Sequence, residues 1–162
     1  MKKILWAVFK WNQRTGLIPL DRDPLAARRG VSSWVIENLY RSFLPTIVDD
    51  GDTFMYDGAG PHRGLVVLQV LRELRIRVMV WPPYSPDLNP IENLWAIMKR
   101  AIYKNHPELE YTPDTEETLT ALVVTAQEAW HDINQEVLSR LALTMPRRVK
   151  AVIKAKGWYT KY

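Results

Sequence analysis

The spacing of apolar residues along the chain predicts strands and helices in alternation. The near-continuous apolar run from Ile4 to Lys10 predicts a strand that is buried on both faces. Polar residues 12–16 end in glycine and predict a turn into a second strand at residues 17–21. Pro19 places that second strand at a sheet edge, because proline cannot donate a hydrogen bond to a neighbouring strand. The two segments together predict a hairpin.

Beyond the hairpin, apolar residues with helical spacing predict a helix from Ser33 to Leu44, which Pro45 closes. The later elements are predicted in the order strand 53–57, helix 62–74, strand 76–81, helix 90–104, and one or two helices within 115–143. Asp114 and Glu117 predict a capping box at the start of the last region. This order predicts an α/β fold with a mixed sheet.

Composition restricts the class of protein further. The 162 residues suffice for one domain with a substantial core, and 47% hydrophobic residues is ordinary for a globular protein. No apolar run approaches the ~20 residues of a membrane-spanning helix. The apolar run near the N-terminus is too short for a signal peptide, so secretion is not expected. The absence of cysteine excludes disulfides and zinc–thiolate sites.

Positive charge gathers at the C-terminal end of the chain. The net charge is +4, and residues 146–162 contain no acidic residue. The basic residues of this segment are Arg147, Arg148, Lys150, Lys154, Lys156 and Lys161. Such a segment is either an anion-binding arm or a solvated tail, and charge favours neither. We therefore predict a domain over residues 1–145 and a basic C-terminal tail over residues 146–162.

Glu92 has two physical explanations. Asn89 is a favourable N-cap, Pro90 then occupies the first helical position, and Glu92 occupies the third. An acidic residue there stabilises the start of a helix through a capping contact and the helix dipole. The sequence around Glu92 is therefore explained without any catalytic role.

The second explanation is metal binding. Asp57 ends a predicted strand, and Glu92 follows the strand that ends at Trp81. Because sites in open α/β sheets form at the carboxyl ends of strands, the two carboxylates are candidates to converge. Mg²⁺ prefers such oxygen ligands, and pairs of these ions promote phosphoryl transfer. Considered alone, Asp57 is better explained as a turn residue.

Two motifs resemble a known family. WPPYSPDLNPIENLWAIMKR, residues 81–100, resembles the third-carboxylate signature of mariner-superfamily DNA transposases. FMYDGAGPHRG, residues 54–64, resembles their second-carboxylate signature, in which a histidine follows the aspartate by five residues. The thirty-four residues between Asp57 and Glu92 match the spacing of one branch of that superfamily. The hairpin and the C-terminal tail are similar to that branch as well, so the resemblance covers nearly the whole chain.

The resemblance implies a ribonuclease-H-like fold and DNA transposition by cleavage and strand transfer. It implies three carboxylates that bind two Mg²⁺ or Mn²⁺ ions, with Asp57 as the second ligand and Glu92 as the third. The implied partners are double-stranded DNA, as transposon ends and as target, and a second copy of the chain in a homodimer. The implied location is the nucleus in a eukaryote and otherwise the cytoplasm.

Further positions have a functional and a structural explanation each. Contact with DNA is the functional prediction for His62, Lys99, Arg100, Arg147, Arg148 and Lys150. His62 could equally be structural, and helix lysines and arginines are often merely solvated. Trp81 and Trp95 are predicted in the core, and Asp87 in a turn. Gly58 stands where the family usually has asparagine, so an amide that could orient Asp57 is absent.

The resemblance also has a gap. In the family the first catalytic aspartate lies on a strand before the hairpin, and no aspartate precedes Asp21 here. We therefore expect the fold without its first central strand, and an impaired nuclease. The alternatives are a non-catalytic DNA-binding or assembly module and a fold remnant without function.

Overall fold

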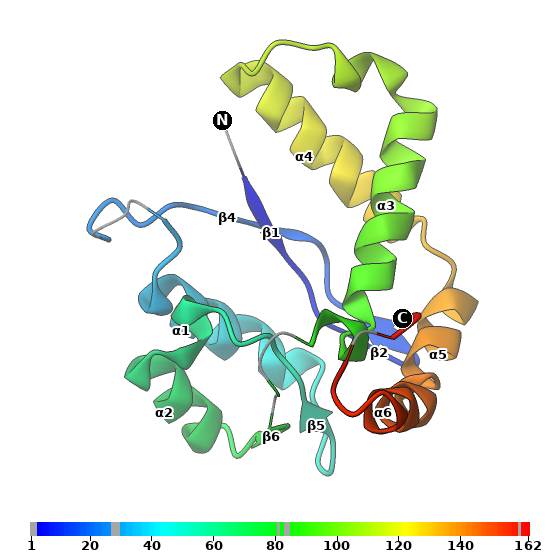
Figure 1. Cartoon of the computed structure of the whole chain (residues 1–162). Coiled ribbons are helices and arrows are strands. Elements are labelled where there is room, and N and C mark those ends of the chain that lie inside the picture. The colour runs from blue at the N-terminus through cyan, green and yellow to red at the C-terminus, as the bar shows by residue number, and fades with distance from the viewer. Residues whose placement is uncertain (1–2, 27–29, 81, 83–84, 159) are drawn as a thin grey trace. The chain divides into compact units, whose positions relative to one another are not determined.

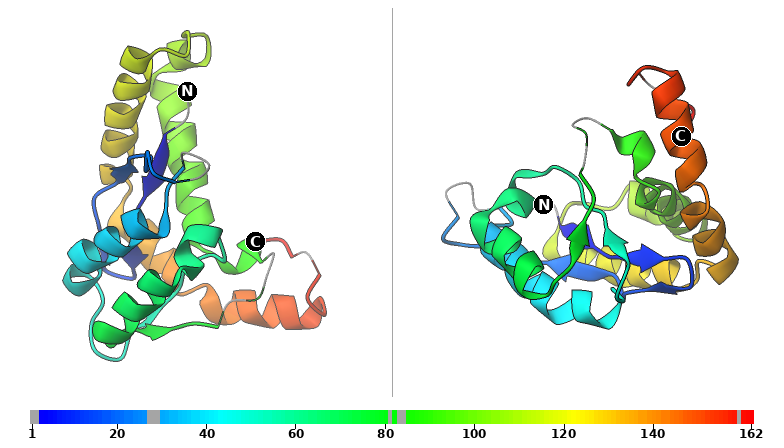
Figure 2. Two further views of the ribbon diagram at one scale, coloured as in Figure 1. Left: turned by 90° about the vertical axis from the view of Figure 1, so that its left-hand side faces the viewer. Right: turned by 90° about the horizontal axis from the view of Figure 1, so that it is seen from below.

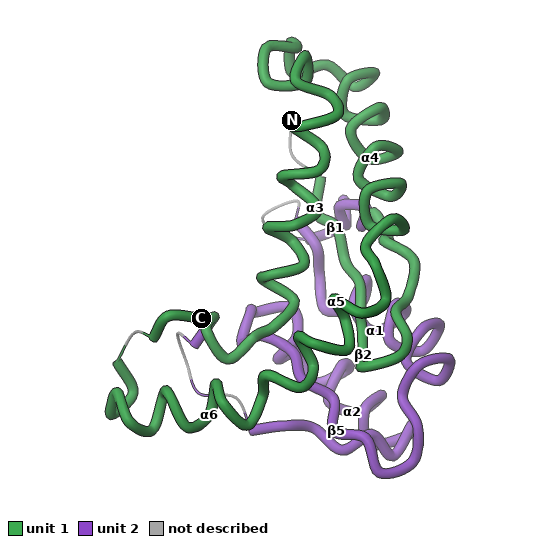
Figure 3. Tube along the Cα trace, turned by 90° about the vertical axis from the view of Figure 1, so that its right-hand side faces the viewer, with its two compact units in different colours: residues 1–19, 86–162 green, residues 20–85 purple. Residues whose placement is uncertain are grey.

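The computed structural model describes residues 3–26, 30–80, 82, 85–158 and 160–162. The chain forms two compact units, which Figure 3 distinguishes by colour. Unit 1 comprises residues 1–19 and 86–162, and unit 2 comprises residues 20–85. Trp81, with its predicted core position, lies outside the described residues. The basic segment 146–162 belongs to unit 1.

The N-terminal strands of unit 1 form the predicted hairpin (Figure 1). Strand β2 (Phe9–Lys10) pairs antiparallel with β3 (Gln13–Arg14), and β1 (Ile4–Trp6) neighbours β4 (Ile18–Leu20). The predicted long strand is interrupted at residues 7–8. There the Val8 N–H donates to Thr15 Oγ1 at 3.0 Å, and the Thr15 N–H donates to the Val8 carbonyl at 2.8 Å. Thr15 therefore joins the two halves of the hairpin through side chain and backbone.

In the described part of unit 1 there are also four α-helices and two short 3-10 helices, and α3 lies beside α4 (Figures 1 and 2). The α-helices are α3 (Ile91–Asn105), α4 (Glu116–His131), α5 (Gln135–Ala142) and α6 (Met145–Lys154). One face of α3 is buried because Leu94, Met98 and Ile102 recur every fourth residue. Trp130 of α4 packs on Trp95, with 5.1 Å between ring centroids, so Trp95 contributes to the core as predicted.

The start of α4 differs by one residue from the prediction. Thr115 is the N-cap, and its hydroxyl accepts a hydrogen bond from the Thr118 N–H at 3.2 Å. The predicted capping box of Asp114 and Glu117 is therefore wrong in register. Threonine is nearly as good a cap as aspartate, and the neighbouring positions compete.

Among its described residues, unit 2 contains two α-helices, two short 3-10 helices, of which one is Leu44–Thr46, and a small parallel sheet. Its other elements are α1 (Ser33–Phe43), β5 (Thr53–Phe54), a 3-10 helix (Gly60–Arg63), α2 (Leu65–Glu73) and β6 (Arg77–Val78). Thr53 lies opposite Arg77 and Phe54 opposite Val78. Helix α1 confirms the predicted periodicity, whereas both strands are shorter than predicted.

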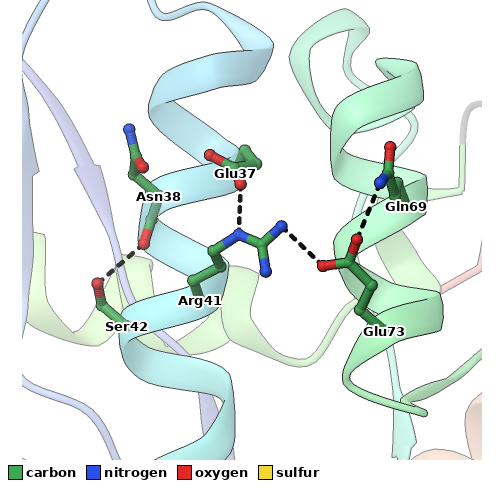
Figure 4. A network of polar contacts seen from close by, with 6 residues as sticks. All are labelled: Glu37, Asn38, Arg41, Ser42, Gln69 and Glu73. Carbon is green, nitrogen blue, oxygen red and sulfur yellow. Dashed lines mark hydrogen bonds and ion pairs between the residues drawn. The ribbon is translucent and has the colours of Figure 1, made fainter.

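Helices α1 and α2 pack together through an apolar layer and a polar network at its rim. The buried residues of the layer are Ile36, Leu39, Tyr40, Val67, Val70 and Leu71. At the rim, the Arg41 guanidinium contacts Glu37 on its own helix and Glu73 of α2 at 2.7 Å (Figure 4). Gln69 donates to Glu73 at 2.9 Å. Because this network is exposed, the apolar layer holds the helices together.

The fold is thus helices with small two-stranded sheets, within the predicted α/β class. Among the described residues, no helix combines the length and apolarity needed to traverse a lipid bilayer.

Candidate functional site

Asp57 follows β5 by three residues and opens the loop that leads to α2. Its side chain is 59% exposed. The Ala59 N–H donates to Asp57 Oδ1 at 3.2 Å, which closes a local turn. The turn explanation from sequence therefore holds, and this hydrogen bond uses Oδ1 alone. A carboxylate can serve both as a turn residue and as a ligand.

His62 is largely sheltered within unit 2, because its side chain is only 15% exposed. Its ring contacts two tyrosine rings, with centroid distances of 5.8 Å to Tyr40 and 5.6 Å to Tyr56, and those two rings are themselves 6.4 Å apart. The Tyr40 hydroxyl lies 2.6 Å from Nδ1, and Asp57 Oδ1 lies 3.6 Å from Nε2. The imidazole therefore makes its contacts within unit 2, with Tyr40, Tyr56 and Asp57. It is poorly placed for the predicted contact with DNA.

The surroundings of His62, Tyr40 and Tyr56 favour the neutral form of each of these three side chains. Burial lowers the pKa of His62, and the charge of Asp57 opposes that change. Burial raises the pKa of Tyr40, and Tyr56 and Asp57 raise it further. Burial also raises the pKa of Tyr56. The phenols thus stay protonated, and the imidazole favours its neutral form.

Tyr40 and Tyr56 were missed by sequence reasoning as partners of His62. In the sequence, Tyr40 stands at one of the apolar-face positions of the helix predicted from Ser33 to Leu44. A signal existed, because a buried tyrosine usually finds a hydrogen-bond partner for its hydroxyl, whereas phenylalanine would satisfy an apolar face alone.

Glu92 lies in the first turn of α3 in unit 1, and its side chain is exposed. Pro90 occupies the cap position with helical backbone angles, and no side chain caps the helix. The predicted N-cap at Asn89 is therefore wrong by one residue, and Glu92 is the second helical residue. The Glu92 N–H donates to the Asn89 carbonyl at 3.2 Å, so Asn89 contributes its backbone to the first turn. The favourable position near the helix N-terminus remains.

Arg148 of α6 holds the segment before α3 in place. Its guanidinium donates to the Asp87 carbonyl at 2.7 Å, to Asn93 Oδ1, and through Nε to Thr144 Oγ1 at 2.8 Å. The Tyr162 ring lies 4.8 Å from its Cζ, a cation–π contact. With 1% exposure, this side chain cannot reach a phosphate, which corrects the prediction that Arg148 contacts DNA.

Asp87 is the turn residue predicted from the sequence, and it also has a tertiary role. Its carboxylate accepts a hydrogen bond from the Thr160 hydroxyl at 2.8 Å, while its carbonyl accepts from Arg148. Thr160 therefore ties the end of the basic segment to the residues that precede α3.

The other predicted DNA contacts lie on exposed helix surface. Lys99 and Arg100 are exposed on α3, and Arg147 and Lys150 are exposed on α6. Arg100 Nε donates to the Ala96 carbonyl at 3.2 Å, which leaves its terminal nitrogens directed outward. These four cations can reach a phosphate backbone.

Asp57 and Glu92 provide hard oxygen donors on solvent-exposed side chains, the chemistry that Mg²⁺ and Mn²⁺ require. Within the part of the chain that the structure describes, no three acidic or histidine side chains form a cluster able to hold a metal ion. Asp57 belongs to unit 2, and Glu92 belongs to unit 1.

The fold matches a group of solved structures. The catalytic domain of Mos1 mariner transposase superimposes with a TM-score of 0.68 and 18% identity, over 98% of this chain and 82% of that chain. The same catalytic domain with Raltegravir and Mg gives 0.70 and 19%, over 98% and 77%. A Mos1 paired end complex with Mn gives 0.72 and 20%, over 98% and 45%. The chain therefore has the ribonuclease-H-like transposase fold, as the motifs predicted.

Sequence comparison is more specific. Residues 25–112 match the family described as DDE superfamily endonuclease. The chain is 31% identical over 159 residues to the Tcb1 transposase of Caenorhabditis briggsae and 30% identical over 162 residues to the Tc1 transposase of Caenorhabditis elegans. Each match covers 98% of this chain and 54% of the relative, so the chain spans about half the length of these relatives. The chain belongs to the DDE superfamily endonucleases and is homologous to the Tc1/mariner transposases.

Proposed function

We propose that Asp57 and Glu92 are ligands of divalent metal ions, Mg²⁺ or Mn²⁺, for phosphodiester cleavage and strand transfer on DNA. The observation that carries the proposal is that both exposed carboxylates lie within residues 25–112, the part that matches the endonuclease family. A bound divalent ion would activate the attacking oxygen and stabilise the leaving one.

The chain's own residues have distinct parts in this proposal. Asp57 presents Oδ2 while Oδ1 is held by the Ala59 N–H. Glu92 presents its carboxylate from the first turn of a helix whose approach is fixed by Arg148. Lys99, Arg100, Arg147 and Lys150 contact the DNA backbone, which positions the scissile phosphate. The family resemblance implies three carboxylate ligands, and the motifs of this sequence match two of them, so we expect weak cleavage.

A nicking assay tests the proposal. Supercoiled plasmid DNA is incubated with the chain and Mn²⁺, and open circles are counted on a gel. We expect nicking that is lost in Glu92→Gln and in Asp57→Asn. The matched controls are Glu116→Gln, an exposed acid in the first turn of α4, and Asp50→Asn, an exposed turn acid. Both controls keep the activity if the proposal holds, and nicking that survives in Glu92→Gln and Asp57→Asn refutes it.

A second function is supported by the exposed cations of α3 and α6. In this alternative the chain is a non-catalytic DNA-binding or assembly module. It predicts salt-sensitive binding to duplex DNA without any nicking, since backbone contacts release counterions. Nicking that depends on Glu92 excludes it.

The relatives suggest the partners. Complexes of Mos1 with a transposon end and in paired-end form are known, so we propose double-stranded DNA and a homodimer for this chain. In a eukaryotic cell such a protein would act in the nucleus. Sedimentation with and without a duplex tests the dimer.

A further inference from the structure

The cluster of Tyr40, His62 and Asp57 is connected within unit 2 and requires no other part of the chain. Tyr40 is 0% exposed and lies on α1, whereas His62 and Asp57 lie in the loop after β5. The Tyr40 hydroxyl is 2.6 Å from His62 Nδ1, and His62 Nε2 is 3.6 Å from Asp57 Oδ1. The three side chains thus form a chain of polar contacts from the core to the exposed carboxylate.

We propose that Tyr40 and His62 are positioning residues for Asp57: Tyr40 donates to Nδ1, and His62 therefore carries its proton on Nε2, directed at Asp57 Oδ1. This inference rests on the proposed metal role of Asp57. A neutral imidazole has one protonated and one accepting nitrogen, so a donor at Nδ1 fixes the proton on Nε2. In a metal-free protein such a contact is often long and shortens when the site is filled.

The consequence concerns the geometry of the carboxylate. Oδ1 is approached by two N–H groups, one from Ala59 at 3.2 Å and one from His62. No hydrogen bond or ion pair from another described residue reaches Oδ2. In this proposal Oδ1 therefore orients the carboxylate, and Oδ2 is the oxygen that binds the ion. Residues that hydrogen-bond to a metal ligand orient it, and substituting them typically weakens metal binding by about 10–100-fold.

Gly58 gives this arrangement additional weight. It stands directly after Asp57, has no side chain, and has open space around its Cα. It has no side-chain amide, as asparagine would have, to orient the carboxylate from the adjacent position. His62 and the Ala59 N–H are the groups that do so in this chain.

Simple aromatic packing is the competing explanation. Tyr40 packs edge-on against Phe54, with ring centroids 5.4 Å apart, and His62 stacks on both Tyr40 and Tyr56. Packing needs the rings alone, whereas the proposal needs the Tyr40 hydroxyl. Tyr40→Phe separates the two explanations because it keeps the ring and removes the hydroxyl. Tyr56→Phe is the matched control, since that ring also stacks on His62.

The first experiment needs no metal. Long-range proton–nitrogen NMR correlations of the histidine rings in the whole chain show which ring nitrogen carries the proton. We expect the Nε2-protonated form for His62, lost or mixed in Tyr40→Phe and retained in Tyr56→Phe. A wild-type His62 protonated on Nδ1 overturns the proposal. If Tyr40→Phe fails to fold, this wild-type spectrum still decides.

The second experiment measures Mn²⁺ affinity by calorimetry. We expect about tenfold weaker binding in Tyr40→Phe and in His62→Gln, the lower end of such effects, with no change in Tyr56→Phe. Unchanged affinity in both Tyr40→Phe and His62→Gln overturns the positioning role. Unchanged affinity in Asp57→Asn instead overturns the proposed metal function. The NMR experiment does not depend on that function, because it tests only which nitrogen of His62 carries the proton.

Discussion

Arg148 is a cation with almost no solvent contact and with neutral partners, the Asp87 carbonyl and the side chains of Asn93 and Thr144. Arginine suits such a site because its planar guanidinium donates in several fixed directions. Each of these acceptors would lose its hydrogen-bond donor if the guanidinium were removed. A buried acceptor without a donor lowers the free energy of unfolding.

We therefore expect Arg148→Met to lower the free energy of unfolding by more than about 2 kcal/mol, because a buried group that loses a charged donor costs ~1–3 kcal/mol. Urea denaturation followed by tryptophan fluorescence measures this. Arg147→Met, at the exposed neighbouring position, is the control and should change stability little. Equal effects of the two substitutions would contradict the structural role of Arg148.

His62 makes stability depend on pH in the metal-free chain. Burial lowers its pKa below the ordinary value of 6.5. Below that value the unfolded chain binds a proton that the folded chain resists, so the free energy of unfolding falls as the pH is lowered from 7 toward 5. We expect His62→Asn to show a weaker loss over this range, in urea midpoints at pH 7 and 5.

His131 provides the control for that experiment. Its side chain is 88% exposed, so His131→Asn should keep the wild-type pH dependence. If His62→Asn and the wild type lose the same free energy between pH 7 and 5, then His62 does not cause the loss.

At the scale of elements, the approach of α1 to α2 depends on Gly64. A Cβ built on Gly64 would lie 2.2 Å from Ser33 Oγ and 2.4 Å from Ser33 Cβ. The backbone angles of Gly64, φ −61° and ψ 143°, suit any residue, so steric contact alone requires glycine here. The starts of the two helices meet at this point.

We expect Gly64→Ala to destabilise the chain by about 1–3 kcal/mol, the usual cost of overpacking. Ser33→Gly removes the obstructing side chain, so the double variant should recover part of the loss beyond the sum of the single effects. Thermal unfolding of the four proteins measures the coupling. Strict additivity would show that Ser33 is not the obstacle.

Sequence patterns predicted the helices well and the strands poorly. The apolar periodicity of α1 and α3 is strong, so both helices appear within a residue or two of the predicted ends. The run from Ile4 to Lys10 is broken because Thr15 bonds the backbone at Val8, a contact across seven positions that composition does not encode. The N-caps of α3 and α4 each lie one residue beyond the predicted position. For α4 this is because neighbouring polar residues compete for the cap.

The candidate site was predicted in part. The motifs predict Asp57 and Glu92 as ligands, and the structure places both side chains at exposed positions. The contact of Tyr40 with His62 spans twenty-two positions, and that of Arg148 with Asp87 spans sixty-one. Contacts of this kind depend on packing. Arg148 was therefore assigned to the surface, because a basic segment usually contacts solvent or DNA.

At the scale of the whole molecule, a net charge of +4 and the exposed cations of α3 and α6 predict binding to duplex DNA that weakens with salt. We expect Arg147→Met and Lys150→Met each to lower the slope of log affinity against log salt by about 1, if each cation neutralises one phosphate. Fluorescence anisotropy with a labelled duplex at several NaCl concentrations measures the slope.

Lys104→Met is the control for the salt experiment, because Lys104 is an exposed cation in the last turn of α3. It should leave the slope unchanged if binding is confined to the proposed cations. A slope that stays the same in Arg147→Met and Lys150→Met would remove α6 from the DNA-binding surface.

The bond from Thr160 to Asp87 has a practical meaning for protein engineering. An affinity tag fused directly after Tyr162, or removal of the last residues to improve expression, would disturb this hydrogen bond. The bond lies just before α3, the helix that bears Glu92. The damage would imitate a defective catalytic group although every acidic residue were intact. A tag in the loop between α3 and α4 avoids this false result.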